Sequence, residues 1–154
     1  MEILKANGIG TQLRRLVEMM DGDLEAIYRL DQPFYTPRYT PVIKALADGG
    51  ALTIKQIAAQ SNISHSAASQ TISRLLKEGL VQSEVDEDRR SRRVSLTREG
   101  AALLPWLQTQ WDATQRAADE LDGELSHPLS AILAEAIRHL EARAFGDRIK
   151  AHRK

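Results

Sequence analysis

The sequence predicts a mostly helical α+β fold, and three observations lead to that prediction. Long segments towards both ends of the chain repeat apolar residues every three or four positions, which is the period of an amphipathic helix. Two shorter helical patterns, separated by a polar break, occupy the middle of the chain. Two short apolar runs around an arginine-rich loop follow them, as in a β-hairpin. The central segments together predict a winged helix-turn-helix.

The first long helix is expected from about Asn7 to Leu30, where one apolar stripe continues through the segment. The proline-containing stretch of residues 33–37 interrupts the chain after it. Thr40 is then expected to cap a short helix that has Pro41 as its first residue and ends at Gly49-Gly50. The stripe of the first helix consists of Ile9, Leu13, Leu16, Val17, Met20, Leu24 and Ile27.

Capping residues define the two central helices. Thr53 and Gln56 form a T-x-x-Q capping box, whose side chains satisfy backbone donors at a helix start. The residues from Ser61 to Ser64 end this helix, and Ser64 is well placed to cap the next one. Gly79 is expected to end the second helix in a left-handed conformation. The buried face of the second helix is predicted to consist of Ala68, Ile72 and Leu75.

The opposite face of the second helix carries short polar side chains, which let a helix in the DNA major groove approach base edges and phosphates closely. Serine is a mediocre helix former, so several serines on one face lower the stability of the helix. A role of these serines in DNA contact explains why they are present. A solvated face without a partner is the alternative interpretation. The residues of the two helices predicted to contact DNA are Lys55, Ser64, His65, Ser66, Ser69, Gln70, Ser73 and Arg74.

The predicted hairpin, or wing, has Leu80-Val81 and Val94-Ser95-Leu96 as its apolar runs. A loop of mixed charge is usually just solvated, and its ion pairs are worth roughly 0 to 1 kcal/mol. Here, however, four arginines lie within five residues, and guanidinium groups suit phosphates and the narrow minor groove. Asp88 is expected to hold one arginine in position. The wing residues predicted to contact DNA are Asp88, Arg89, Arg90 and Arg92.

Two more helical segments follow the wing. One is expected from Thr97 to about Asp122, with a kink at Pro105, and the other from Pro128 to about Arg143. A winged helix needs neither the first nor the last helix of this chain, so we expect these helices to pack against each other and against a second copy. An intramolecular bundle without a dimer is the alternative. The predicted organisation is one domain, 1–154, with 40–100 as its DNA-binding part and 1–32 and 101–154 as its helical dimerisation part.

Composition limits the classes of protein that fit. The 154 residues have a formal net charge of zero, which favours a local basic site over a surface that coats nucleic acid. Residues 53–98 contain eight Lys or Arg and five Asp or Glu, so this segment is locally positive. The absence of cysteine excludes disulfides and thiolate metal sites. Without a membrane-length apolar run or a signal-peptide core, we expect a cytoplasmic protein with no membrane partner.

Enzyme motifs are missing from the sequence. It has no P-loop, G-x-G-x-x-G, G-x-S-x-G or H-E-x-x-H pattern, and its four histidines lack the mutual spacing of metal ligands. We therefore expect a protein without catalytic activity, metal or cofactor.

The motifs in combination resemble the MarR family of bacterial transcription regulators. Asp88-Arg89-Arg90 matches the family's D-x-R wing tip, and the segment from Leu96 to Gly100 matches its LT-x-x-G element. The resemblance implies that Arg90 enters the minor groove, that Asp88 orients it, and that helices from both termini form a dimer on a palindromic operator. Residues 98–125 also resemble the regulator half of MarR-acetyltransferase fusions. No acetyltransferase fits in the remaining chain, so we expect no such activity.

A MarR-like layout also implies an effector site where two groups of aromatic residues converge between the dimer helices and the DNA-binding part. A small aromatic or apolar molecule is the expected effector, and simple packing of the junction explains the same residues without one. The candidate effector residues are Tyr28, Phe34, Tyr35, Tyr39, Trp106 and Trp111, and Arg14, Arg15 and Arg38 are available to receive a carboxylate.

The predicted function is therefore sequence-specific binding of duplex DNA by a homodimeric regulator, in the form of an effector-responsive repressor. The alternative from another class is a winged helix that binds other proteins and no longer binds DNA. The arginine-rich wing and the short polar helix face argue against that alternative.

Overall fold

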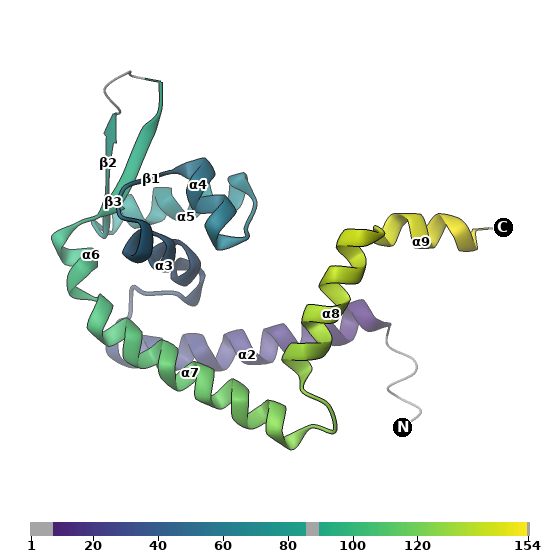
Figure 1. Ribbon diagram of the computed structural model, residues 1–154. Coiled ribbons are helices and arrows are strands. Elements are labelled where there is room, and N and C mark those ends of the chain that lie inside the picture. The colour runs from purple at the N-terminus through teal and green to yellow at the C-terminus, as the bar shows by residue number, and fades with distance from the viewer. Residues whose placement is uncertain (1–7, 86–89, 154) are drawn as a thin grey trace. The chain divides into compact units, whose positions relative to one another are not determined.

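The computed structural model describes residues 8–85 and 90–153, which form many helices and one small sheet (Figure 1). Contacts divide the chain into two compact units, Met1–Leu104 and Pro105–Lys154. The first unit contains the sheet and the central helix pair, whereas the described part of the second is helical. The predicted fold class, a mostly helical α+β winged helix-turn-helix, is confirmed.

The first unit begins with the long amphipathic helix α2 (Ile9–Asp31), close to its predicted bounds. A 3-10 turn then leads into a series of shorter helices, which contact the strands of the sheet. These elements are η1 (Pro37–Tyr39), α3 (Thr40–Gly49), α4 (Ile54–Ser61), α5 (His65–Lys77) and α6 (Arg98–Ala102).

The start of α3 differs from its prediction by one residue. Thr40 is the first residue of the helix rather than its N-cap, because η1 leads directly into α3. The hydroxyl of Thr40 hydrogen-bonds the hydroxyl of Tyr35, with the two oxygens 3.0 Å apart. The expected capping role of Thr40 is therefore wrong, because its side chain anchors a neighbouring tyrosine instead.

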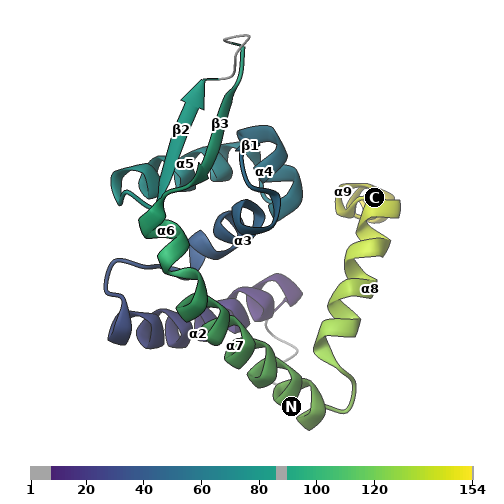
Figure 2. The ribbon, with the colours of Figure 1, turned by 60° about the vertical axis from the view of Figure 1, so that its left-hand side comes forward.

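The sheet has three antiparallel strands, β1 (Leu52–Thr53), β2 (Val81–Val85) and β3 (Arg92–Leu96), in the order β1-β3-β2. The hairpin of β2 and β3 extends away from the helices (Figure 2). Its register sets Val85 opposite Arg92, so pairing continues beyond the apolar runs that predicted it. Arg92, expected in the loop, is thus the first residue of β3. The two-residue β1 is too short to show a strand pattern, and it was not predicted.

The winged helix has a core of its own. α3, α4 and α5 turn their apolar faces inward, and the buried face predicted for α5 is confirmed. Burying one such side chain stabilises a fold by roughly 1.5 to 3 kcal/mol relative to leaving it exposed. The core residues of these helices and of the sheet include Val42, Ile43, Leu46, Ile57, Ala68, Ile72, Leu75, Val81 and Val94.

The helix expected from Thr97 to Asp122 is divided rather than kinked. α6 ends at Ala102 and α7 (Leu104–Glu124) begins two residues later. Pro105 is then the second residue of α7, a position where its missing N–H breaks no helical hydrogen bond. The helices that follow are α8 (Leu129–Ala142), close to its predicted bounds, and α9 (Phe145–His152), which was not predicted.

A side-chain contact joins the end of α7 to the start of α8. The carboxylate of Asp122 accepts a hydrogen bond from the backbone N–H of Ser130 at 3.2 Å and another from the Ser130 hydroxyl. The Ser130 hydroxyl is the main cause of a pKa of Asp122 below its ordinary value. The contact therefore holds this carboxylate in its charged form at the N-terminus of α8, where negative charge is favourable.

Candidate nucleic-acid interface

Side-chain caps and one left-handed residue fix the turn between α4 and α5. The Thr53 hydroxyl accepts from the Gln56 N–H at 3.2 Å, and the Gln56 side chain accepts from the Thr53 N–H at 2.9 Å. Asn62 follows α4 with a φ of 53°, which turns the chain sharply. The Ser64 hydroxyl then accepts from the Ala67 N–H at 3.1 Å and starts α5. Both predicted caps are confirmed, and they fix where α5 leaves the turn.

The predicted polar face of α5 lies on the surface of the protein. His65, Ser66, Gln70, Ser73 and Arg74 are exposed, and Ser69 is half-buried. The Ser73 hydroxyl donates to the backbone oxygen of Ser69 at 3.0 Å, and its oxygen, on an exposed residue, still has acceptor capacity. This face can present short hydrogen-bonding groups to base edges.

The end of α5 is tied to the wing by the LT-x-x-G element. The Thr97 hydroxyl donates to the backbone oxygen of Gly79 at 2.6 Å and accepts from the Gly100 N–H at 3.1 Å. The backbone N–H of Thr97 donates to the oxygen of Leu80 at 3.0 Å. A Cβ added at Gly100 would lie 2.1 Å from that same Leu80 oxygen. The element therefore packs α6 tightly against the chain that leaves the α5 helix, and glycine is the residue that permits it.

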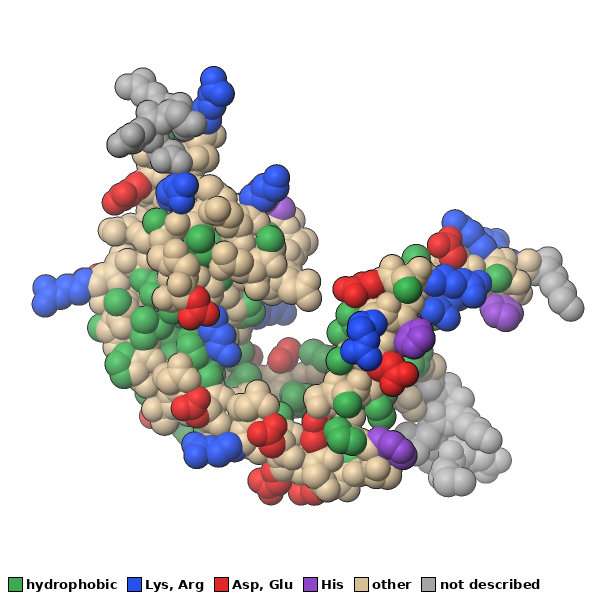
Figure 3. Space-filling view, viewed as in Figure 1, with side chains coloured by type: hydrophobic (Ala, Val, Ile, Leu, Met, Phe, Trp, Pro, Cys, Tyr) green, Lys and Arg blue, Asp and Glu red, His purple; other side chains and the backbone are tan. Residues whose placement is uncertain are grey.

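Positively charged side chains surround the hairpin end of the first unit (Figure 3). Lys55 on α4, Arg90 beside the wing tip and Arg92 on β3 are all exposed. Arg93 has a structural contact, because its Nη1 donates to the backbone oxygen of Ala51 at 3.2 Å. Two further predicted residues, Asp88 and Arg89, lie outside the described residues.

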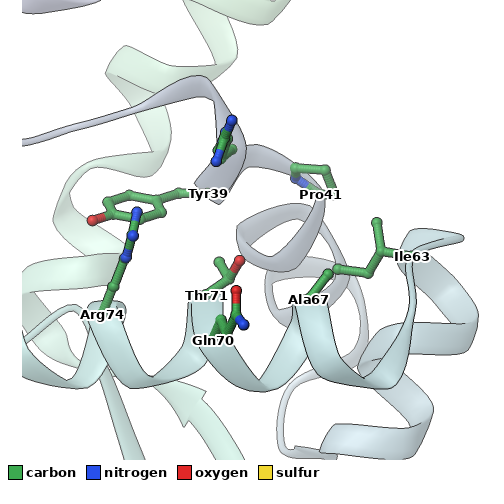
Figure 4. A pocket seen from close by; sticks show the side chains of 8 residues that line it. Tyr39, Pro41, Ile63, Ala67, Gln70, Thr71 and Arg74 are labelled. Atoms are coloured by element: carbon green, nitrogen blue, oxygen red, sulfur yellow. The ribbon is translucent and has the colours of Figure 1, made fainter.

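A groove of about 370 Å³ lies between η1 and α5 (Figure 4). Tyr39 and Pro41 form one wall, and side chains of α5 face them across the opening. The groove was not predicted, because no periodic pattern indicates that residue 38 lies beside residue 74. Its lining residues are Arg38, Tyr39, Pro41, Ile63, Ala67, Gln70, Thr71 and Arg74.

Three of the candidate effector residues form a buried tyrosine cluster. The rings of Tyr28 and Tyr35 have centroids 5.4 Å apart, and those of Tyr35 and Tyr39 are 5.5 Å apart in an edge-to-face arrangement. Burial raises the pKa of Tyr35 and also that of Tyr39 above the ordinary value. Phe34 is exposed, and Trp106 and Trp111 are half-buried in the second unit.

A comparison with protein families matches the central part of the chain. Residues 35–91, which include α3, the helix-turn-helix and β2, match the model of the MarR family. This central part of the chain is therefore similar to MarR-family transcription regulators. A search of curated protein sequences found no match.

Solved structures of other regulators share the fold. PcaV from Streptomyces coelicolor, solved with its natural ligand, is 20% identical over 90% of this chain and 95% of its own, with a TM-score of 0.67. BpsR from Bordetella bronchiseptica, whose DNA binding is regulated by 6-hydroxynicotinic acid, is 21% identical over 84% and 98%, with a TM-score of 0.60. A probable regulator from Pseudomonas aeruginosa is 25% identical over 90% and 97%, with a TM-score of 0.58.

The family that residues 35–91 match consists of transcription regulators with a winged helix and not of enzymes. Within the described residues, no helix has the length and apolar character to cross a membrane. No group of His, Asp or Glu in that part of the chain is arranged to hold a metal ion.

Proposed function

We propose that this chain binds duplex DNA as a homodimer and represses transcription from a palindromic operator. The observation that carries the proposal is the exposed polar face of α5 on the same compact unit as the exposed Arg90 and Arg92. A helix of short polar side chains suits the major groove, and arginines on a hairpin suit the minor groove. Residues 40–100 act as the DNA-binding part.

Residues 1–32 and 101–154 form the dimerisation part in this proposal, and their exposed apolar side chains support it. α2 exposes much of its apolar stripe, and neither α8 nor α9 buries a single residue. A two-fold dimer is the commonest closed oligomer, and its symmetry matches the two half-sites of a palindrome. The apolar side chains left exposed on these helices are Ile9, Leu13, Val17, Met19, Met20, Ile27, Leu30, Ile132, Ile137, Leu140, Phe145 and Ile149.

A small aromatic or apolar effector completes the proposal. Its support is the gathering of aromatic rings between Tyr28 and Tyr39, with Trp106 and Trp111 as the other candidate residues. The tyrosines already pack against one another, and this packing is the competing explanation of the cluster. Titration with a panel of aromatic acids, followed by tryptophan fluorescence and DNA affinity, tests the site. Unchanged fluorescence and affinity across the panel would leave a constitutive DNA binder as the better account.

Replacing Arg90 tests the DNA-binding proposal directly. Arg90→Ala is expected to weaken operator binding by roughly 1 to 3 kcal/mol, because one guanidinium group no longer reaches the DNA. Folding should not change, since Arg90 is exposed near a loop tip. The operator is first selected from a random duplex pool, and affinity is then measured by fluorescence anisotropy at several salt concentrations.

Arg29→Ala is the matched control, because Arg29 is an exposed arginine of the same unit and its ion pair with Glu25 is on α2. It should bind operator as the parent does. Equal affinity of Arg90→Ala and the parent at every salt concentration would show that the wing assignment is wrong. A parent that binds no duplex would favour the protein-interaction module instead.

A further inference from the structure

The groove between η1 and α5 contains two arginines, Arg38 and Arg74, and only one of them belongs to the predicted DNA-binding face. We propose that this groove binds the sugar-phosphate backbone of the duplex that α5 reads, with Arg38 and Arg74 as its phosphate contacts. The inference rests on the proposed DNA binding and adds a backbone contact from outside the helix-turn-helix and the wing.

The charge of the groove is complementary to phosphate. Both guanidinium groups belong to exposed residues, and none of the eight lining residues is acidic. Among the described residues, no carboxylate forms a salt bridge with Arg38 or with Arg74. Guanidinium groups form charge-assisted, often bidentate hydrogen bonds with phosphate oxygens. The charge of the groove lining therefore suits an anion, although Arg38 also lines a neighbouring pocket that contains Glu18, Asp21 and Glu25.

The chain around Arg38 is held in place before any ligand binds. Pro37 precedes it with a fixed φ, and Tyr39 follows it with only 5% of its surface exposed. Tyr39 packs edge-to-face against Tyr35, which in turn hydrogen-bonds Thr40. Because the backbone at Arg38 is already ordered, a phosphate contact costs mainly the freedom of one side chain.

The groove continues from the face of α5 that is proposed to read bases. Ala67, Gln70, Thr71 and Arg74 follow one another at helical spacing and form the α5 wall of the groove. The adjacent stripe contains Ser66, Gln70 and Ser73, so Gln70 belongs to both. A helix in the major groove has a phosphate backbone on each side, and contacts to that backbone set its register. The groove lies along one flank of the reading face, where such a backbone passes.

The wall of the groove suits a sugar as well as a phosphate. Tyr39, Pro41 and Ile63 line it together with Ala67, and these side chains offer apolar surface beside the two charges. The Thr71 hydroxyl and the Gln70 amide add neutral hydrogen-bonding groups of the kind that contact phosphate oxygens in protein–DNA complexes. This combination fits a strand of DNA lying lengthwise in the groove.

The experiment measures how the affinity for a pool of random-sequence duplexes depends on salt, for the full chain and four variants. Arg38→Gln removes the proposed contact, Arg38→Lys keeps a point charge, and Arg74→Gln removes the second contact. Arg29→Gln is the matched control, and circular dichroism confirms that each variant is folded. Removing one phosphate-binding side chain should reduce the slope of log K against log salt by about 0.9 per protomer.

The expected result is a smaller slope for Arg38→Gln and Arg74→Gln, a slope near the parent's for Arg38→Lys, and no change for Arg29→Gln. For each arginine removed, the affinity advantage of the parent should shrink roughly threefold between about 50 and 200 mM salt. Equal slopes for the parent and Arg38→Gln would overturn the inference and leave the proposed function intact. A changed base preference in Arg38→Gln would also overturn it, because backbone contacts do not read sequence. If the parent binds no duplex at all, both proposals fall.

Discussion

The winged helix and the terminal helices share the same apolar periodicity, but the winged helix buries its apolar face and the terminal helices leave theirs exposed. Within the winged helix, Val42, Ile57 and Leu75 are completely buried in a core that one chain supplies. On α8 and α9, by contrast, Ile137 and Phe145 remain 54% and 58% exposed. An amphipathic stripe therefore predicts that a face will be covered, but not which chain covers it. The difference separates residues that stabilise the fold from residues available to a partner.

Two isoleucine-to-alanine variants test this difference with the largest expected effect. Ile72→Ala should lower the free energy of unfolding by roughly 2 to 5 kcal/mol, because it leaves a cavity in the core. Ile137→Ala should change the stability of the separate chain by about 0.5 kcal/mol or less, because its side chain is exposed there. Denaturant unfolding at low protein concentration measures both values.

The same pair should behave in the opposite way when self-association is measured. Sedimentation equilibrium is expected to show weaker association for Ile137→Ala, whereas Ile72→Ala has no contact with the proposed partner. A chain that associates as tightly with Ile137→Ala as without it would place the partner on another surface.

Gly100→Ala tests how closely α6 packs in the winged helix. The added Cβ meets the backbone oxygen of Leu80 at 2.1 Å, so α6 has to move away from the wing. We expect a loss at the upper end of the roughly 1 to 3 kcal/mol that overpacking costs. Gly22→Ala is the control, because a Cβ on α2 meets nothing within 4 Å and should stabilise the helix by up to about 1 kcal/mol. A higher midpoint temperature of thermal unfolding for Gly100→Ala than for the parent would contradict the close packing.

The smallest expected effect concerns the contact of Asp122 with Ser130 in the second unit. The hydrogen bond from the Ser130 hydroxyl lowers the pKa of Asp122 in the folded chain. Its stabilising contribution is therefore present above the pKa of the unfolded carboxyl, and is lost as the pH falls through the lower folded value. Ser130→Ala should move the pKa of Asp122 back towards its ordinary value, as read by carboxyl NMR. Ser126→Ala should leave it in place, and an equal shift in both variants would contradict the assignment.

Local patterns in the sequence were sufficient to predict much of the winged helix. The caps at Thr53 and Ser64 and the buried face of α5 depend on residues three or four apart, so sequence spacing describes them fully. The expected cap at Thr40 failed because its hydroxyl found a partner in Tyr35, five residues earlier. Strand β1 has two residues and is too short to show a period. Helix α9 is as long as the predicted α4, but it lacks the side-chain cap that marked the start of α4.

In the candidate site, too, only the features that depend on residues close in sequence were predicted. The exposed polar face of α5 follows from helical spacing, and the exposed arginines beside and within β3 follow from a charge run in the chain. The groove depends instead on η1 lying against α5, residues far apart in sequence that only the fold brings together. Arg38 was predicted only as a group available to an effector carboxylate, because nothing near it in sequence indicates that it shares a groove with Arg74.

The hydrogen bonds of Thr97 have a consequence for the DNA that this chain would select. They join the end of α5 at Gly79 to the returning strand of the wing, so helix and hairpin meet at a fixed joint. If α5 and the hairpin keep a fixed spacing, the protein cannot adjust to different groove widths. The duplex then has to deform to make both contacts. We expect its preferred operators to have easily unstacked pyrimidine–purine steps between the major-groove and minor-groove contacts, at positions that no side chain touches.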